Sequence, residues 1–392
     1  MQSLSERTAG FTDSVIRRMT RVSMQYGAVN LSQGFPDFEP PKEILDRMAQ
    51  VAYEDFHQYS ITWGSQNFRE ALAAKQSRCM GRRIDPNTEI VTTCGSTEAM
   101  MAAMMTVCNP GDKVAVFSPF YENYGADAIL SGADPVYVPL VPPDFHYDSE
   151  ALERAFQAGA KALILCNPSN PCGKVFTMEE MEEIAELAKR YDAFVITDEV
   201  YEYIIYGENR HISMAALPGM YERTITCSSL SKTYSMTGWR VGYAAGNAAL
   251  IKGMTSLQGH TTSNTCSIAQ YAALEAISGP QDSVESMRVE FDKRRKFLVE
   301  RLNSMDGITC NNADGAFYLM PNMTAFYDKE WNGKKIADSF GMADYLLAEA
   351  KIAVVPGGAF ESPDNIRIAY SNSMESLIEG MNRMEAALKK LG

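Results

Sequence analysis

The feature that most constrains this chain is an alternation of short, apolar, β-rich runs with helical patterns. Seven such runs occur, at residues 89–93, 113–118, 135–140, 161–166, 193–197, 224–228 and 240–246. Strands that are joined through helices pair in parallel, and the helices then cover both faces of the sheet. The alternation therefore predicts an α/β fold in which a mainly parallel seven-stranded sheet forms a large domain.

The pattern changes after residue 280. A long charged helix over 282–305 is expected there, and separated strands and a last helix follow at 307–310, 316–320, 352–355, 365–370 and 374–390. Strands and helices that do not alternate are typical of an α+β arrangement. We therefore predict a large domain over 46–280 and a smaller α+β domain formed by the N-terminal part, 1–45, and the C-terminal part, 281–392.

The charge balance limits the partners of the chain. Its 392 residues carry a formal net charge of -13, and a negative surface repels phosphate backbones and anionic lipid headgroups. Near the N-terminus, charged side chains from Glu6 to Arg21 interrupt the apolar stretches, so we expect no secretory signal. The most apolar helix-like stretch, 99–108, is about half as long as a membrane span. We expect small-molecule substrates, and neither a nucleic acid nor a membrane as partner.

The eight cysteines and four histidines show no pattern of a disulfide framework or a metal site. None of the cysteines forms a Cys-x-x-Cys pair, and in a chain of this size they are typical of reduced thiols in a reducing compartment. The histidines lack the spacing of metal ligands, so we expect no metal. These observations predict a cytoplasmic protein.

Polar and aromatic side chains stand directly after five of the predicted strands. In an open parallel sheet, ligands bind beyond the carboxyl ends of the strands, so these side chains are expected to meet. In chain order they are Gly95, Ser96 and Thr97, then Tyr121, then Asn167 and Asn170, then Asp198 and Tyr201, then Ser229, Ser231 and Lys232. Together they supply an anion cradle, an aromatic ring, amides, a carboxylate, a phenol and a lysine.

This set matches the needs of a cofactor that carries an aromatic aldehyde and a phosphate. A lysine amine forms a Schiff base with the aldehyde and is later released as a general base. A carboxylate keeps the ring nitrogen protonated, while backbone N–H groups, hydroxyls and an arginine hold the phosphate. Each residue alone has a structural explanation, such as a helix cap for Asp198 or a surface charge for Lys232. No structural need explains the whole set.

The segment S-L-S-K-T-Y-S-M-T-G-W-R-V-G-Y at residues 229–243 closely resembles the cofactor-lysine segment of class I and II aminotransferases of pyridoxal-phosphate (PLP) fold type I. The resemblance runs along nearly the whole chain, from L-S-Q-G-F-P-D-F at 31–38 to N-I-R-I-A-Y at 365–370. It implies a PLP-dependent transaminase that moves the amino group of an L-amino acid to a 2-oxo acid by a ping-pong mechanism.

The resemblance also implies a role in cofactor binding for each matching residue. Lys232 would carry PLP as a Schiff base, and Asp198 would pair with the pyridinium nitrogen. Tyr201 and Asn170 would contact the ring oxygen, and Tyr121 would stack on the ring. The phosphate contacts would come from Gly95, Ser96, Thr97, Ser229, Ser231 and Arg240.

Further matches concern the substrate and the assembly. Arg367, helped by the backbone of Gly34, resembles the arginine that binds the substrate α-carboxylate, and Tyr121 and Asn170 would also face the substrate. Tyr59 resembles the tyrosine that reaches the phosphate of the neighbouring subunit. The resemblance therefore implies a homodimer with shared active sites.

The chain departs from the family pattern at two places. Cys172 stands where the family has threonine, and we expect a tolerated change of similar volume, with a reactive thiol near the cofactor as the alternative. Gly259 and His260 stand where aspartate-specific members have an arginine from the neighbouring subunit, so strict selectivity for aspartate is in doubt. The 31–38 motif is closer to that of members acting on aromatic, methionine-like or glutamine-like amino acids.

Two other functions are compatible with parts of this pattern. A fold type I lyase or cyclase would use the same cofactor contacts but eliminate from Cβ or Cγ, and release of ammonia or a thiol would identify it. An aminotransferase-like sensor would carry a winged-helix DNA-binding head, whereas about thirty residues precede Leu31. We therefore expect an enzyme.

Overall fold

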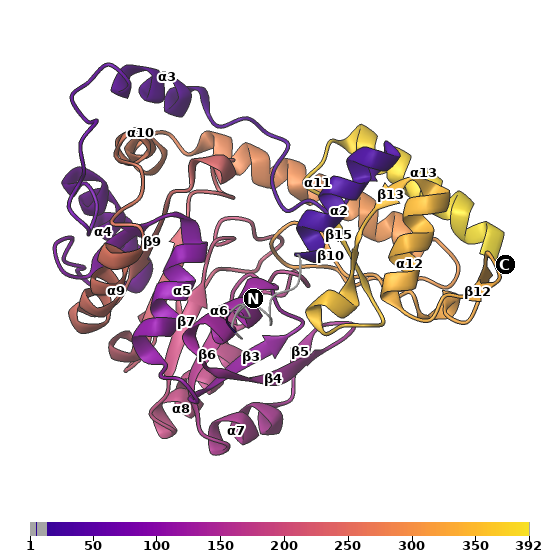
Figure 1. Cartoon of the computed structure of the whole chain (residues 1–392), viewed down its shortest axis with the longest axis horizontal. Helices are drawn as coiled ribbons and strands as arrows, with labels where there is room; N and C mark the ends of the chain where they lie inside the picture. The colour runs from indigo at the N-terminus through magenta and orange to yellow at the C-terminus, as the bar shows by residue number, and fades with distance from the viewer. Residues whose placement is uncertain (1–4, 6–13, 392) are drawn as a thin grey trace.

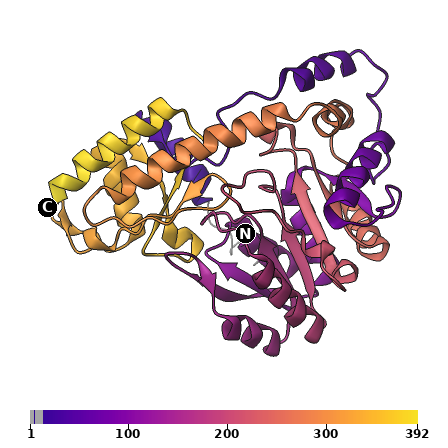
Figure 2. The same ribbon diagram turned by 180° about the vertical axis from the view of Figure 1, so that it is seen from behind.

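The computed structural model describes residue 5 and residues 14–391. Residues 1–4 and 6–13 of the predicted N-terminal part, which include Glu6, lie outside the described residues. A large sheet with its helices fills one half of the molecule, and helices α11 and α13 with several short strands form the other half (Figure 1). The reverse view shows α11 running from the first half into the second (Figure 2).

The large sheet has eight strands in the order β2-β9-β8-β7-β6-β3-β4-β5. Their bounds are β2 (Ile90–Thr93), β3 (Lys113–Ser118), β4 (Asp134–Val141), β5 (His146–Tyr147), β6 (Ala160–Cys166), β7 (Phe194–Asp198), β8 (Thr224–Ser229) and β9 (Gly242–Ala245). The pairs β4–β3, β3–β6, β6–β7 and β7–β8 are parallel. β9 is antiparallel to β2 and β8, and β5 is antiparallel to β4. The predicted α/β fold with a mainly parallel sheet is confirmed, and the short strand β5 is added to the seven predicted strands.

Alternating side chains of the strands build a separate core on each face of this sheet. Val114 and Val116 of β3 pack with α5, α6 and α9, whereas Ala115 and Phe117 pack with α7 and α8. Helices α3, α4 and α10 pack near the β2 edge around Ile90. The helix bounds are α3 (Lys42–Val51), α4 (Gln66–Met80), α5 (Gly95–Val107), α6 (Asn123–Ser131), α7 (Ser149–Gln157), α8 (Met178–Arg190), α9 (Ala248–Thr261) and α10 (Ser267–Ser278). Burial on both faces explains why these strands are continuous apolar runs.

Local sequence sets the ends of the helices. In α8, Thr177 and Glu180 form a capping box, in which each side chain accepts a hydrogen bond from the other residue's backbone N–H. In α2 (Val15–Tyr26), Gly27 takes the left-handed conformation with φ 58° and ends the helix. Each of these helix ends is thus set by the residue directly beside it.

The other half of the molecule is built from short strands and helices. Its elements are α11 (Asp282–Asn303), β10 (Tyr318–Leu319), β11 (Glu330–Trp331), β12 (Lys334–Lys335), α12 (Ser339–Tyr345), the π-helix η5 (Leu346–Ala350), β13 (Ile352–Ala353), β14 (Val355–Pro356), β15 (Ile366–Ala369) and α13 (Met374–Leu391). β15 pairs antiparallel with β10 and β14, and β1 (Val29–Asn30) pairs parallel with β13. Leu31 and Tyr201 are buried in the same apolar core, so the N-terminal segment and the segment that follows β7 both join this half.

Short 3₁₀ helices complete the described structure. They are η1 (Met214–Ala216), η2 (Tyr221–Arg223), η3 (Thr237–Trp239), η4 (Thr324–Phe326) and η6 (Gly357–Phe360). Within the described part of the chain, no helix combines the length and the apolar character that a membrane crossing requires.

Several strand predictions need correction. Residues 307–310 form no strand, because Thr309 makes only an isolated bridge to Asn322. The strand expected at 316–320 is reduced to β10, since Ala316 has φ 57°, which is outside the extended region. Residues 352–355 divide between β13 and β14, which pair with different partners. The run expected at 240–246 becomes a strand only at Gly242, where β9 begins.

Candidate active site

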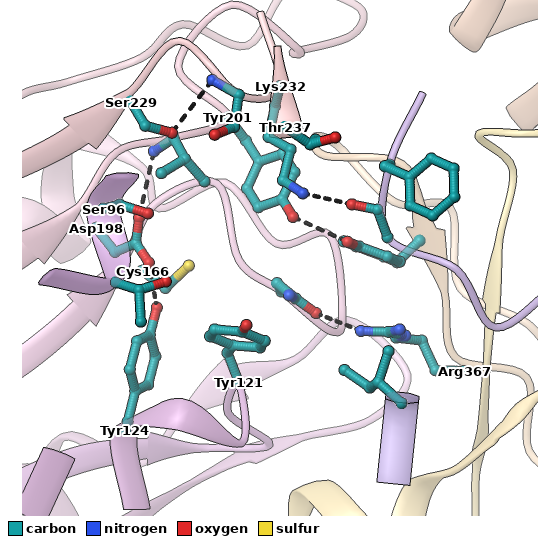
Figure 3. A pocket seen from close by; sticks show the side chains of 18 of the residues that line it. Ser96, Tyr121, Tyr124, Cys166, Asp198, Tyr201, Ser229, Lys232, Thr237 and Arg367 are labelled. Carbon is teal, nitrogen blue, oxygen red and sulfur yellow. Dashed lines mark hydrogen bonds between the residues drawn. The ribbon is translucent and has the colours of Figure 1, made fainter. Parts of the chain in front are cut away.

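A cavity of about 430 Å³ lies at the carboxyl ends of the parallel strands, between the two halves of the molecule (Figure 3). Its lining includes most of the predicted site residues: Gly34, Ser96, Thr97, Tyr121, Asn170, Asp198, Tyr201, Ser229, Ser231, Lys232, Arg240 and Arg367. Of the predicted site residues, Gly95 and Tyr59 do not line it. A volume of this size is typical of small-molecule sites.

Lys232 follows β8 and extends into this cavity (Figure 3). Its Nζ donates a hydrogen bond to the carbonyl of Gly34, which comes from the N-terminal segment. Burial, followed by the positive charges of Arg367 and Arg240, lowers the pKa of Lys232 to about 8, against the opposing effect of Asp198. About a tenth of this amine is therefore uncharged, and thus nucleophilic, at pH 7, which is far more than for a lysine with the ordinary pKa.

Asp198 ends β7 and is 5% exposed. Its carboxylate accepts a hydrogen bond of 2.9 Å from the hydroxyl of Tyr124 and one of 3.4 Å from the backbone N–H of Val200. Burial raises the pKa of Asp198 to about 6, although both hydrogen bonds favour the charged form. A carboxylate buried without a cation among its hydrogen-bond partners is suited to a protonated ring nitrogen.

The start of α5 forms an anion cradle with Arg240. Gly95 has φ 75°, and a Cβ at this position would lie 2.4 Å from Nη2 of Arg240. A Cβ on Gly242 would lie 2.4 Å from the backbone carbon of Gly95, so both glycines allow the close approach of β9 to the helix start. Ser96 and Thr97 follow at the helix N-terminus, where N–H groups and the helix dipole favour an anion.

Arg240 itself differs from expectation. It was expected in a strand, but it follows η3 with a left-handed backbone of φ 55°. Its guanidinium donates to the carbonyls of Thr237 and Cys94 at 3.0 and 3.4 Å, and no carboxylate of the described residues neutralises it. The left-handed backbone turns the side chain toward Gly95 and the helix start.

Arg367 reaches the cavity from β15 and is fully buried. Its Nη1 donates to Oδ1 of Asn170 at 2.9 Å, and its Nη2 donates to the carbonyl of Ser32 at 2.8 Å. Its Nε has no hydrogen-bond partner, and no carboxylate in the described part of the chain forms an ion pair with it. A buried guanidinium without a counter-ion is suited to a carboxylate ligand.

Four tyrosine rings complete the cavity wall. The hydroxyls of Tyr201 and Tyr318 lie 2.9 Å apart. Tyr121 meets Tyr124 edge-on, with ring centroids 5.8 Å apart. In Figure 3, Asp198 and Arg367 lie on opposite sides of the open space, with Tyr121 between them.

Tyr59 lies away from this cavity. It is 93% exposed and belongs to a second hollow formed with residues 56–60 and 262–268. Gly259 and His260 in α9 do not line the cavity either. Within one chain, therefore, Tyr59 does not meet the other predicted site residues.

Cys172 is fully buried, and its Sγ contacts Oγ of Ser169 at 3.3 Å. Burial raises the pKa of the Cys172 thiol, which keeps it protonated and unreactive at neutral pH. These contacts favour the tolerated change over the reactive thiol.

Sequence reasoning missed several residues of the wall. They are Ile16, Arg17, Phe35, Tyr124, Cys166, Val200, Thr237 and Tyr318. Tyr124 lies three positions after Tyr121 on the start of α6, so helical spacing was a usable signal for it. Tyr318 lies inside the strand expected at 316–320, but no local pattern distinguishes it from a core tyrosine.

The donors of the cavity fit pyridoxal phosphate. They provide an amine for the aldehyde, a buried carboxylate for the ring nitrogen, and a helix start with an arginine for the phosphate. Fold and cavity together define an enzyme of the PLP-dependent class, with the α/β architecture of fold type I.

The chain belongs to the family of class I and II aminotransferases, whose model matches residues 26–383. The aspartate aminotransferase of Geobacillus stearothermophilus is 36% identical over 388 residues, which cover 97% of this chain and 98% of that protein. The solved aspartate aminotransferase of Rhizobium meliloti is 30% identical with a TM-score of 0.94, covering 99% of both chains. The aromatic aminotransferase of Pyrococcus horikoshii is 35% identical with a TM-score of 0.88, covering 95% of this chain and 100% of that chain.

These findings confirm a PLP-dependent transaminase, which uses amino acid and 2-oxo acid substrates. The lyase or cyclase alternative is not favoured.

Proposed function

We propose that this cavity is the site at which the amino group passes from an L-amino acid to the cofactor and then to a 2-oxo acid, with Lys232 as the cofactor-bearing residue. PLP, when bound, supplies an aldehyde that joins to amines and a ring that accepts electrons from the substrate Cα. The observation that carries the proposal is that Lys232, whose pKa is lowered to about 8, shares one buried cavity with Asp198.

The proposed role of each residue in cofactor binding follows from its place in the cavity. With PLP bound, Asp198 would hold a proton on the ring nitrogen, supported by the hydrogen bond from Tyr124, and Tyr121 would face the ring. Tyr201 and Asn170 bind the ring oxygen. The phosphate is held by Gly95, Ser96, Thr97, Ser229, Ser231 and Arg240. No metal takes part in this proposal.

Arg367 binds the α-carboxylate of the substrate, with Asn170 and the backbone of Gly34 beside it. With PLP bound, this contact would fix the orientation of the substrate and thus which bond of its Cα is broken. Lys232, once its amine is free, would act as the base that takes the Cα proton and then as the acid that gives it back. The same groups act in reverse on the second substrate, which gives the ping-pong order.

The proposed assembly is a homodimer with shared sites, in which Tyr59 of one subunit contacts the phosphate in the other. The large exposed fraction of Tyr59 supports this, because an isolated chain gains nothing from such a ring in water. We also propose the division into a large domain, 46–280, and a small domain, 1–45 with 281–392. The eight free cysteines support a reducing compartment such as the cytoplasm. The names of the relatives suggest aspartate as the first amino donor to test.

The test of the function is Lys232→Ala, with Lys174→Ala as a lysine control outside the cavity. Lys232→Ala should lose the absorbance of lysine-linked PLP and lower kcat at least about 10⁴-fold, because both the covalent link and the proton transfer are lost. A panel of amino acids with 2-oxoglutarate or pyruvate measures the activity. An unchanged spectrum and turnover in Lys232→Ala would contradict the proposal.

A further inference from the structure

Tyr318 occupies a central place in the cavity that no sequence pattern assigns. It lies in β10, is 1% exposed and lines the cavity wall. Its hydroxyl lies 2.9 Å from that of Tyr201, and its ring lies 4.3 Å from the guanidinium carbon of Arg367. One side chain thus touches two residues that have separate proposed tasks.

The hydroxyl of Tyr318 has few possible hydrogen-bond partners. Tyr201 is its hydrogen-bond partner, and the backbone of Gly34 lies close by, where an added Cβ would be 2.7 Å from the hydroxyl oxygen. Burial raises the pKa of both phenols, so each keeps its single proton. When Tyr201 gives its proton to a ligand, the proton between the two oxygens must therefore come from Tyr318.

A hydroxyl that accepts a hydrogen bond becomes a stronger donor, because hydrogen bonds in a chain polarise one another. Tyr318 is thus placed to strengthen the bond that Tyr201 donates to the ring oxygen of the cofactor. The two rings also pack edge-on, with centroids 5.8 Å apart and an interplanar angle of 82°. This packing restrains the direction of the Tyr201 hydroxyl.

The ring of Tyr318 acts on Arg367 by a different contact. β10 and β15 are neighbours, with Tyr318 paired to Ala369, so the ring and the guanidinium are held by one small sheet. Phe360 lies 5.0 Å from the guanidinium carbon. Aromatic faces attract a cation and limit its rotation. This contact keeps Nη1 of Arg367 hydrogen-bonded to Asn170.

We propose that Tyr318 is a positioning residue that acts on the cofactor through Tyr201 and on the substrate carboxylate through Arg367. The inference rests on the proposed function of these two residues and adds a physical link between them. The hydroxyl serves the first contact and the ring serves the second, so two substitutions separate them.

The experiment compares Tyr318→Phe, Tyr318→Leu and Tyr201→Phe in the holoenzyme. In Tyr318→Phe the ring stays, so KM for the amino acid should change less than about twofold. The pH midpoint of the absorbance change of bound PLP should move upward by about half to one pH unit, because a weaker Tyr201 bond leaves more charge on the ring oxygen. In Tyr318→Leu the ring is lost too, and KM should rise about 2- to 30-fold.

The double variant Tyr201→Phe/Tyr318→Phe tests the link directly. If Tyr318 acts through Tyr201, the midpoint of the double variant should equal that of Tyr201→Phe alone. Tyr370→Phe is the matched control, because Tyr370 is a buried tyrosine whose hydroxyl donates to the carbonyl of Ala316 at 3.2 Å and does not line the cavity. Its midpoint and KM should be those of the unmodified protein.

Two results would overturn the inference. The first is a Tyr318→Phe midpoint equal to that of the unmodified protein while Tyr201→Phe shifts it. The second is a Tyr318→Leu variant that retains PLP and has an unchanged KM. Failure of the proposed function looks different, because Tyr201→Phe would then leave the spectrum unchanged as well.

Discussion

Asp127 in α6 and Asp198 at the end of β7 are buried carboxyl groups that interact electrostatically. Asp127 lies on α6, three positions after Tyr124, and is 2% exposed, and its Oδ2 has no hydrogen-bond partner. Burial, and then the negative charge of Asp198, raise the pKa of Asp127 well above its usual value. Asp198, by contrast, accepts two hydrogen bonds that hold its charge. Burial therefore favours the protonated form of Asp127, whereas the hydrogen bonds of Asp198 favour its charged form.

The raised pKa of Asp127 makes the free energy of unfolding depend on pH. Because the folded-state pKa of Asp127 is raised, the folded state binds more protons than the unfolded state above pH about 4. Asp127 then destabilises the fold increasingly as the pH rises toward its folded-state pKa. We expect Asp127→Asn to be more stable than the unmodified protein at pH 8 by roughly 1–3 kcal/mol, and by less at pH 5. Urea unfolding at the two pH values measures the difference.

Asp306→Asn is the control for this prediction, because Asp306 is an exposed residue outside both cores of the large sheet. It should change stability by less than about 0.5 kcal/mol at both pH values. A gain for Asp127→Asn that is the same at pH 5 and pH 8 would contradict the protonation of Asp127.

Lys232 gives a second prediction at the residue scale. Its ammonium must lose a proton before the amine can attack an aldehyde, and its pKa is lowered to about 8. The rate at which the cofactor-free protein captures PLP should therefore rise about tenfold between pH 6 and 7 and level off above pH about 9. Stopped-flow absorbance measures this rate. A rise that continues through pH 10 would indicate a lysine with the ordinary pKa.

At the scale of elements, α2 connects the two halves of the molecule beside the cavity. Its apolar residue Met19 packs with Leu347 and Ala353 in the second half. At its other end, Ser14 caps the helix and donates a hydrogen bond to Glu122, which precedes α6. The helix thereby brings one further cation, Arg17, to the cavity wall.

Arg17 is suited to a second carboxylate on the substrate. Its side chain has no hydrogen-bond or ion-pair partner among the described residues, and Lys232, Arg240 and Arg367 already have proposed tasks. We expect Arg17→Ala to raise KM for aspartate and glutamate about 2- to 5-fold, the effect of a solvent-exposed charge, and to leave KM for alanine nearly unchanged. Steady-state kinetics with the three substrates measures the effect.

Arg18→Ala is the matched control, because Arg18 is the next residue of α2 but lines the neighbouring hollow instead of the cavity. It should leave all three KM values unchanged. An equal effect of Arg17→Ala on alanine and on aspartate would show that Arg17 does not select the second carboxylate.

At the scale of the whole molecule, exposed apolar side chains gather on the segment that follows α3. Tyr53 is 95% exposed, Tyr59 93% and Ile61 61%. α3 and this segment extend outward at the edge of the large half (Figure 1). Such a group of exposed rings is typical of a surface that a second subunit covers.

The proposed homodimer predicts complementation between two impaired variants. Lys232→Ala and Tyr59→Ala are each expected to impair the site at limiting PLP. In a mixed dimer, one site combines Lys232 from one chain with Tyr59 from the other, so mixing and reassembly should restore about a quarter of the unmodified activity. Activity after mixing, with sedimentation to establish the dimer, measures this. No gain on mixing would mean that Tyr59 and Lys232 do not meet across subunits.

Much of the large half follows from the sequence alone. Val114 to Phe117 belong to an apolar run because both faces of β3 are covered, and such runs are visible without a structure. Since parallel strands end at one edge of a sheet, the position of Lys232 and Asp198 after their strands was enough to predict that they share a site. Helix ends such as the Thr177 capping box are equally local.

The three-dimensional structure alone decided the rest. The contacts of Tyr318 with Tyr201, of Arg367 with Ser32, and of Ser14 with Glu122 join segments more than 100 residues apart. Local patterns record which face of a strand or helix is buried, because hydrophobic spacing follows the period of the element. They do not record which distant side chain fills the opposite wall, since that depends on how the two halves pack. For this reason the amine and its acid were predictable, whereas the phenol between Tyr201 and Arg367 was not.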